Sequence, residues 1–551
     1  MRSTYKMLAA GALIALTAAS PALAGDPIRR IDILTRPQAV NPPEFQSAQL
    51  VAQEWRKLGL DVNVRAIPWE QITDVVWYNR ETWDTGSWQM VGRPERSDPD
   101  EFIHNLFHSS TVEKGYNFIG YVNPEYDAVA DAQRIEIDPE KRRELIFEAQ
   151  EILARDEPNM MLAHSTVVLA YDKTVWDPAS VVDQSGIGIR NTWTFNNITP
   201  LGDQKDIIVN SGTNLNMINP LRQSGAVDSW VVELLYDRLA RVGPDGLPQP
   251  WAAESYEWVD DTTINVKLRS GMMWHDGVPL TAEDVKFTYD AAVSGEAPMY
   301  QPFASNVESI EIVDDTTLVF KLKQPSASFI TSSFAKLNIT PKHIWEPILE
   351  DLKTKPENAE SYQEEMPVGS GPFKYVRWLS NEEVVLEAVP THFQPPKAER
   401  FILRIVPNVE ATLGMLRSGE INFLGDYPGD PQVLIDMAAE DGDLEIAQTI
   451  EMGFKYIAFN LRRAPFNDPA FRKALSRSVN RKLIVNAAYK GFAEESNSVI
   501  SPALDYWRKP GLSDGFETGT DYAAKLLEDA GYELIDGRLH YPGDIKETIT
   551  E

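Results

Sequence analysis

The sequence predicts an α/β protein of two lobes, and three observations support this class. Short segments alternate apolar and polar residues, as half-buried strands do. Between them lie longer runs with apolar residues three and four positions apart, which is the spacing of amphipathic helices. The chain has 551 residues, which is too long for one hydrophobic core, so two or more lobes are expected.

The N-terminal third predicts strands and helices in alternation. Such an order is typical of a lobe with a mainly parallel sheet. A further helix should begin at Asp138-Pro139, because Asp caps and Pro opens a helix well. The expected elements before it are a strand at 28–36, a helix from Pro42 to Gly59, a strand at 60–67, a short helix at 69–78 and a buried strand at 86–91.

The middle of the chain predicts hairpins and a capped helix. The similar runs 259–263 and 313–317 each precede an alternating strand, which predicts two hairpins in one sheet. Residues 281–284, Thr-Ala-Glu-Asp, form a helix-start pattern. Further on, the turn at 369–373 should lead into a strand. Near the C-terminus, Asp468-Pro469 should start a helix.

Composition narrows the class of protein. Hydrophobic residues make up 43% and charged residues 24%, as in ordinary globular proteins. The formal net charge of −30 argues against nucleic-acid binding and against an anionic membrane surface. There is no cysteine, so neither a disulfide framework nor a lipid-carrying cysteine is expected.

Residues 1–24 have the pattern of a secretory signal peptide. Arg2 and Lys6 form a basic start, an apolar run follows, and Ala22-Leu23-Ala24 supplies a small-residue cleavage site. The apolar run is short for a membrane anchor, which is the alternative. We therefore expect the mature protein in the periplasm.

Several motifs together resemble the dipeptide/oligopeptide/nickel-binding family of ABC-transporter solute-binding proteins, also known as extracellular solute-binding protein family 5. The most specific is the run 268–285, LRSGMMWHDGVPLTAEDV, which is similar to the opening of the family's mature chains. Other matching runs are Tyr236-Asp237, the turn at 369–373 and the segment 456–484. The resemblance implies a type II, two-lobe periplasmic binding-protein fold of the large peptide-binding class, with an extra subdomain and no enzymatic activity.

The matching segments occur in a rotated order. Residues 59–153 resemble the closing portion of the family, whereas the opening portion begins after residue 200. The sequence therefore looks like a circular permutant, and a misassembled gene is the alternative. The expected organisation is lobe 2 from residues 25–165 and 452–551, with lobe 1 from residues 166–451 between them and an extra α+β subdomain at about 246–345.

By resemblance, three stretches should face the ligand between the lobes. They are 212–219, 449–454 and 87–98. Arg93 either pairs with a ligand carboxylate or phosphate, or forms a structural ion pair with Glu95, Asp98 or Asp100. Trp88 either stacks on the ligand or fills the sheet edge. The predicted ligand-binding residues are Trp88, Gly92, Arg93, Glu95, Asn214, Asn216, Met452, Gly453 and Phe454.

Motifs for catalysis or metal binding are weak. His104 and His108 share one helical face, as in zinc peptidases, but Asn105 replaces the catalytic Glu and no third ligand is evident in the sequence. We therefore predict no catalytic residue, no metal and no cofactor.

The predicted function is capture of a small solute and its delivery to the permease subunits of an ABC importer, by a monomer. Relatives bind peptides, nickel complexes, opines or sugars, and Arg93 with Glu95 favours a short peptide or another carboxylated or zwitterionic compound. The alternatives are a secreted hydrolase acting on peptides or sugars, and a periplasmic chaperone or sensor on the same fold.

Overall fold

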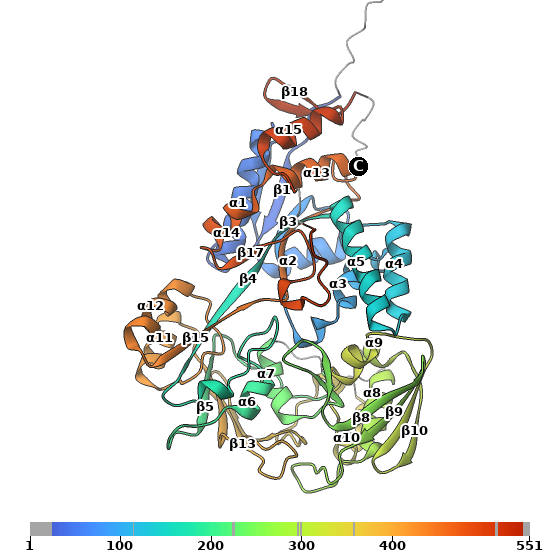
Figure 1. Ribbon diagram of the computed structural model, residues 1–551, viewed down its shortest axis with the longest axis vertical. Helices are drawn as coiled ribbons and strands as arrows, with labels where there is room; N and C mark the ends of the chain where they lie inside the picture. Colours follow the sequence, from blue (N-terminus) through green and yellow to red (C-terminus); the bar gives the residue numbers. More distant parts are fainter. Residues whose placement is uncertain are drawn as a thin grey trace, which may run out of the picture.

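The computed structural model describes residues 25–113, 115–222, 226–294, 297, 300–355, 359–512 and 516–543. The proposed signal peptide, residues 1–24, lies outside these ranges. Two lobes are stacked along the long axis of the molecule (Figure 1). The described helices include none with the length and apolar character needed to cross a membrane.

Lobe 2, the upper one in Figure 1, is built around a mixed sheet to which both ends of the described chain contribute. The strand order is β15-β4-β16-β3-β1-β2, with β17 paired to β4. β15 and the second half of β4 extend from this sheet into lobe 1, where Leu444 and residues 168–171 join the lobe 1 core. The strands are β1 (Ile31–Thr35), β2 (Val62–Ala66), β3 (Thr85–Met90), β4 (Asn159–Asp172), β15 (Leu444–Ile450), β16 (Phe454–Phe459) and β17 (Ala493–Glu495).

Helices cover both faces of this sheet. Consecutive residues of β4 point to opposite faces, so Met160 joins the core under one helix layer and Met161 the core under the other. The first layer contains α1 (Pro42–Lys57), α13 (Pro469–Ser478), α14 (Arg481–Ala488) and α15 (Thr520–Asp529), and the second contains α3 (Asp100–Phe107), α4 (Pro124–Ile135) and α5 (Pro139–Asp156).

The local elements expected from the sequence are present in this lobe. Asp138 caps α5 by accepting from the Glu140 N–H, and Asp468 caps α13 by accepting from the Ala470 N–H. The expected helix at 69–78 consists of α2 (Trp69–Thr73) followed by the π-helix η1 (Asp74–Tyr78).

The prediction of a mainly parallel sheet is wrong. β1 pairs in parallel with β2 and β3, but β16 is antiparallel to both β3 and β4, and β4 is antiparallel to β15 and β17. The strand–helix alternation is confined to residues 31–90, and the antiparallel partners come from distant parts of the chain that this pattern cannot reveal.

Lobe 1, the lower one in Figure 1, contains a sheet of order β12-β13-β14-β5. Its strands are β5 (Asp206–Ser211), β12 (Phe373–Leu379), β13 (Glu383–Ala388) and β14 (Arg400–Ile405). Around them lie α6 (Thr192–Asn197), α7 (Ala226–Leu235), α11 (Val409–Ser418), α12 (Pro431–Asp441) and the short hairpin β6 (Ala240–Val242) with β7 (Pro248–Pro250).

The turn at 369–373 leads into β12 as expected. A Cβ atom at position 369 would lie 1.8 Å from the carbonyl oxygen of Leu235, so this close approach of two backbones requires glycine.

A second sheet in lobe 1 contains the two similar hairpins. Its order is β10-β11-β9-β8, and the two hairpins pair through β9 and β11. Thr281 and Asp284 form a reciprocal capping box at the start of the helix that covers this sheet. The elements are β8 (Ala253–Asp260), β9 (Thr263–Leu268), β10 (Val307–Asp314), β11 (Thr317–Leu322), α8 (Ala282–Val293), α9 (Gln301–Ala304) and α10 (Lys342–Leu352).

Candidate ligand-binding site

The two lobes are joined through one pair of antiparallel strands. Residues 159–163 of β4 pair with β16 in lobe 2, and residues 166–172 of the same strand pair with β15 on the lobe 1 side, from which the chain continues into β16. Figure 1 shows β4 as a long strand running between the lobes. The chain therefore passes between lobes at about 164–166 and at 450–453.

Side chains at this crossing are fixed by buried hydrogen bonds. His164 is fully buried, with Nδ1 at 2.7 Å from the Gly453 carbonyl oxygen and Nε2 at 2.9 Å from Ser496 Oγ. Burial lowers the pKa of His164 to about 4. The imidazole is therefore neutral near pH 7 and acts at the crossing as a hydrogen-bonding group without charge.

A cavity of about 290 Å³ lies beside this crossing and is lined by both lobes. Residues 91–94 and Glu451 line it from lobe 2 and the crossing, and α7 and the residues after it line it from lobe 1. Its wall carries five basic side chains and two acidic ones: Arg93, Arg190, Arg238, Arg241 and Lys336 against Glu233 and Glu451. The excess of cations suits an anionic group.

On the lobe 2 side, the end of β3 presents Gly92 and Arg93. A Cβ at position 92 would lie 2.7 Å from Met452 Cγ, so glycine lets this loop pack against the crossing. The Gly92 N–H lies 3.4 Å from Glu451 Oε1. Arg93 precedes the 3₁₀ helix η2 (Pro94–Ser97) and is partly exposed.

The ion-pair alternative for Arg93 is not found with either aspartate. Asp98 is held by Arg142 through contacts of 2.7 and 2.8 Å, and Asp100 pairs with Arg134 at 3.3 Å. The Arg93 side chain forms no hydrogen bond or ion pair with the side chains that the structure describes, and it lines the cavity. The side chain of Glu95 lies outside the described part of the structure.

Glu451 supplies negative charge at the crossing. Its carboxylate lies 3.0 Å from Lys455 Nζ and accepts from Ser165 Oγ at 2.8 Å. Burial alone would raise the pKa of Glu451, but the Lys455 ammonium and the Ser165 hydroxyl together bring it below its ordinary value. Glu451 is therefore ionised beside Lys455.

On the lobe 1 side, Arg190 stacks on Trp230 of α7. The guanidinium carbon lies 4.1 Å from the ring centroid, and Nη1 donates to the Gly425 carbonyl oxygen. Nε is buried and has no protein partner among the described residues. Burial lowers the pKa of Arg190 to about 10, so it remains a cation at neutral pH.

Arg238 and Arg241 extend the basic wall from the segment after α7. Arg238 pairs with Glu233 at 3.3 Å and donates to Asn338 Oδ1 at 2.9 Å. Arg241 donates to the Glu233 carbonyl oxygen at 2.6 Å, and its Nε is a second buried donor without a partner in the described structure. Glu233 thus neutralises one of the two arginines, and the wall stays cationic.

The structure separates the predicted site residues into two groups. Gly92 and Arg93 line the cavity. Trp88 is buried in the lobe 2 core, where its Nε1 donates to the Tyr456 hydroxyl at 2.7 Å, so it fills the sheet and does not line the cavity. Met452 and Phe454 are fully buried in the same core.

The remaining predicted residues have structural contacts. A Cβ at Gly453 would lie 2.1 Å from the Met90 carbonyl oxygen, so Gly453 allows β16 to approach β3. Asn214 binds the 380–381 turn of lobe 1, and the Asn216 N–H donates to Asp228. Of the three stretches expected to face the ligand, 212–219 contributes nothing to the cavity lining.

Sequence reasoning missed the lobe 1 wall. Trp230 and Glu233 are three positions apart on α7, which is the spacing of residues on one helix face, and Arg238 lies inside the family-like run around Tyr236. That helical spacing was the sequence feature that could have predicted these residues as neighbours. Arg190 lies in an irregular segment whose position depends on tertiary packing alone.

Comparison with known proteins supports the resemblance. The model of the bacterial extracellular solute-binding proteins, family 5 Middle, matches residues 248–551, which is more than half of the chain. The oligopeptide-binding protein AppA of Bacillus subtilis is 28% identical over 338 residues, covering 60% of each chain. The glutathione-binding protein GsiB of Escherichia coli K12 is 28% identical over 340 residues, covering 60% of this chain and 62% of its own.

The chain thus spans about 60% of the length of these curated relatives. Among solved structures, AppA of B. subtilis with a nonapeptide aligns with a TM-score of 0.47 and 24% identity, covering 62% of this chain and 68% of that one. An oligopeptide-binding protein of Thermotoga maritima aligns with a TM-score of 0.48 and 26% identity, covering 60% and 63%. On the family match, which includes both family-like hairpins and β16, the chain belongs to the family 5 bacterial extracellular solute-binding proteins.

Proposed function

We propose that this protein is the periplasmic solute-binding component of an ABC importer. It would hold a small solute with at least one carboxylate or other anionic group between its lobes and deliver it, as a monomer, to the permease subunits. The basic wall of the interlobe cavity carries this proposal, because the Arg93 side chain forms no hydrogen bond or ion pair with a described side chain, and Arg190 and Arg241 each keep a buried donor without a partner among the described residues.

Cavity size favours a short ligand. Small-molecule pockets usually measure about 300–1,000 Å³, and this one is about 290 Å³. A compound of dipeptide size fits that volume better than a long peptide does. Glu451 and the loop carrying Glu95 lie on the lobe 2 side, so we expect the amino group of a zwitterionic ligand there and its carboxylate against the arginines.

Family membership supports transport over catalysis. The relatives reported above are named as binding proteins, and the cavity wall offers charged groups for recognition. The uptake cycle would close the lobes over the ligand about the β4–β15 crossing, and the closed form would dock on the permease.

The test is ligand binding by the full chain with Arg93→Ala. Native mass spectrometry identifies any small molecule retained from the host, and isothermal titration with dipeptides, opines and oligosaccharides covers ligands that are lost. A charge-assisted hydrogen bond contributes about 1.5–3 kcal/mol, so Kd should rise roughly 10- to 150-fold.

Arg65→Ala is the matched control, because it removes the same charge from an exposed position on β2 of the same lobe. It should leave Kd unchanged. Equal affinity of Arg93→Ala and the unmodified chain for the best ligand would contradict the assignment of this cavity. Steady turnover of any candidate ligand by the purified protein would contradict the transport role.

A further inference from the structure

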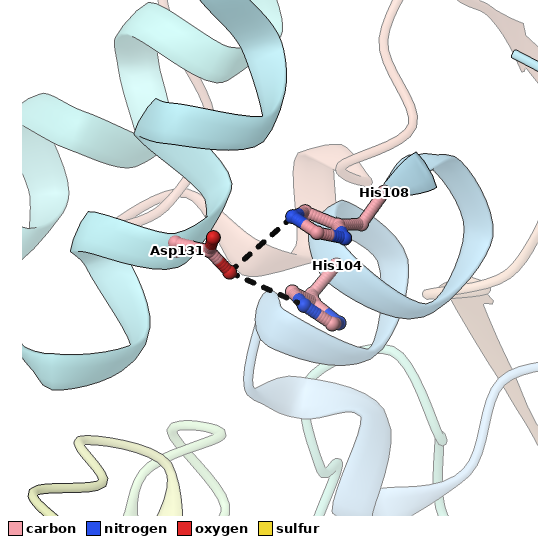
Figure 2. Close-up of side chains that lie close together, drawn as sticks. All are labelled: His104, His108 and Asp131. Carbon is pink, nitrogen blue, oxygen red and sulfur yellow. Dashed lines mark ion pairs between the residues drawn. The ribbon is translucent and has the colours of Figure 1, made fainter. Parts of the chain in front are cut away.

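Two buried histidines and an aspartate meet in lobe 2, away from the ligand cavity. His104 lies in α3 and His108 caps the end of that helix, while Asp131 lies in the neighbouring helix α4 (Figure 2). The imidazoles are 6% and 7% exposed, and the Asp131 side chain is 64% exposed. Of the three side chains, Asp131 is therefore the one exposed to solvent.

The two rings present the same nitrogen to the carboxylate. They stack with centroids 4.3 Å apart and planes 14° from parallel. His104 Nε2 lies 3.6 Å and His108 Nε2 lies 3.3 Å from the same oxygen, Asp131 Oδ1 (Figure 2). All three atoms lie within 4.8 Å of one another.

These separations match the edges of a tetrahedral coordination shell. Zinc binds imidazole nitrogen at about 2.0–2.1 Å and carboxylate oxygen at about 2.0–2.2 Å, which places adjacent tetrahedral ligands roughly 3.3–3.5 Å apart. The two histidine–aspartate distances of 3.6 and 3.3 Å lie close to that spacing. The two Nε2 atoms lie within 4.8 Å of each other, and because the rings are stacked nearly parallel, at least one ring must turn before both Nε2 lone pairs point at a shared ion.

A second observation also points to a ligand. Nε2 of His108 is buried and forms no hydrogen bond among the described residues, although carboxylate oxygens of Asp131 and Asp127 lie 3.3 and 3.8 Å away. Buried polar atoms are normally satisfied, and an unpaired one calls for an explanation. An ion at the shared focus of the three side chains would satisfy it.

Two existing contacts would change when an ion binds. Arg134 Nη1 lies 3.3 Å from His104 Nε2, and the same side chain pairs with Asp100 at 3.3 Å and is 43% exposed. The Arg134 side chain can turn outward and still keep its ion pair with Asp100. His108 Nδ1 accepts from the Ser110 N–H at 3.0 Å and lies 2.7 Å from Ser110 Oγ. With Nε2 bound to an ion, Nδ1 carries the proton and donates to Ser110 Oγ, and the Ser110 N–H loses its acceptor.

We propose that His104, His108 and Asp131 form a binding site for a divalent cation of the zinc class, with the fourth position open to water. Two imidazoles and one carboxylate are the donor set of such three-ligand sites. The sequence suggested no third ligand, because Asp131 comes from a different helix, and only the packing of α3 against α4 supplies it. The site would tie these two helices together and is independent of the proposed solute binding.

The test is titration of the metal-free full chain with Zn²⁺, followed by Co²⁺ absorption spectroscopy. We expect one equivalent to bind at micromolar zinc, the visible bands of four-coordinate Co²⁺ to appear, and the thermal midpoint to rise. Asp131→Asn should weaken zinc binding at least tenfold. Because Asp131 is exposed, this variant should fold normally.

Arg134→Gln provides a test of opposite sign. It removes a competing donor and a positive charge beside the ion, so zinc should bind several-fold more tightly. His343→Gln is the matched control, since His343 forms a comparable histidine–aspartate pair with Asp276 at 2.8 Å on the surface of lobe 1. Absence of binding at micromolar zinc, or binding that neither Asp131→Asn nor Arg134→Gln alters, would overturn the proposal.

Discussion

Glu364 is a buried carboxyl group whose protonation should set the pH dependence of lobe 1 stability. It is 8% exposed, and its Oε2 accepts from Trp345 Nε1 at 3.2 Å. Burial raises its pKa to about 7, and the hydrogen-bonding neighbours Trp345 and Tyr236 only partly oppose this shift. Glu364→Gln keeps the shape of the side chain and removes its titration.

The sign follows from proton binding in the two states. An unfolded chain releases this proton near 4.5, whereas the folded chain keeps it until about 7. Below about 4.5 the carboxyl group is protonated in both states, so it does not change the free energy of unfolding. As pH rises, the unfolded state ionises first, so stability is lost between the two values. The loss is about 1 kcal/mol at about pH 5 and about 3 kcal/mol at about pH 8, since one pKa unit corresponds to about 1.4 kcal/mol.

Glu364→Gln should therefore gain stability relative to the unmodified protein as pH rises. We expect the difference in unfolding free energy between the two proteins to change by roughly 2 kcal/mol between about pH 5 and about pH 8. Urea unfolding followed by tryptophan fluorescence measures the unfolding free energy at each pH. Any effect of the amide that does not depend on pH cancels when the two pH values are compared. Glu365→Gln is the control at the exposed neighbouring position. A Glu364→Gln difference that is the same at both pH values would refute the reasoning.

Two further predictions concern structural contacts. Arg142→Ala should lower the free energy of unfolding by roughly 3–5 kcal/mol, because it leaves Asp98 buried without the 2.7 Å contact that now balances its charge. Thermal melts measure the change. The double variant Arg142→Ala with Asp98→Ala should lose less stability than the two single variants added together. Thr281→Ala should cost about 1 kcal/mol by removing the cap of α8, whereas Thr281→Ser should be nearly neutral in urea unfolding.

Helix starts were predictable because each depends on residues a few positions apart. Asp138-Pro139, Thr281 with Asp284, and Asp468-Pro469 all cap helices as the sequence indicates. The paired hairpins were also predictable, since each strand alternates and each turn repeats the same Asp-Asp-Thr-Thr pattern.

The candidate site was predictable in part. Gly92 and Arg93 follow a recognisable strand, and the cavity lies at that strand's end. The position of Trp88 could not be predicted, because a buried strand has the same residue types whether a side chain faces a ligand or the core. Its contacts with Trp83, Phe118 and Tyr456 place it in the core.

The rotated order of the family-like segments stays a prediction, and the sheet of lobe 2 gives it a physical basis. Residues that the rotation would make neighbours lie together: the Gly25 N–H donates to the Tyr541 carbonyl oxygen at 3.0 Å, and the Ile28 N–H donates to that of Leu539 at 2.9 Å. A sheet is held by its hydrogen bonds and its two packed faces, whichever loop carries the chain ends. β16 lies between β3 and β4, so both faces of the lobe 2 sheet are covered by segments from both ends of the described chain. The fold therefore depends on which strands pair, and the same pairing is compatible with a rotated order of the segments along the chain.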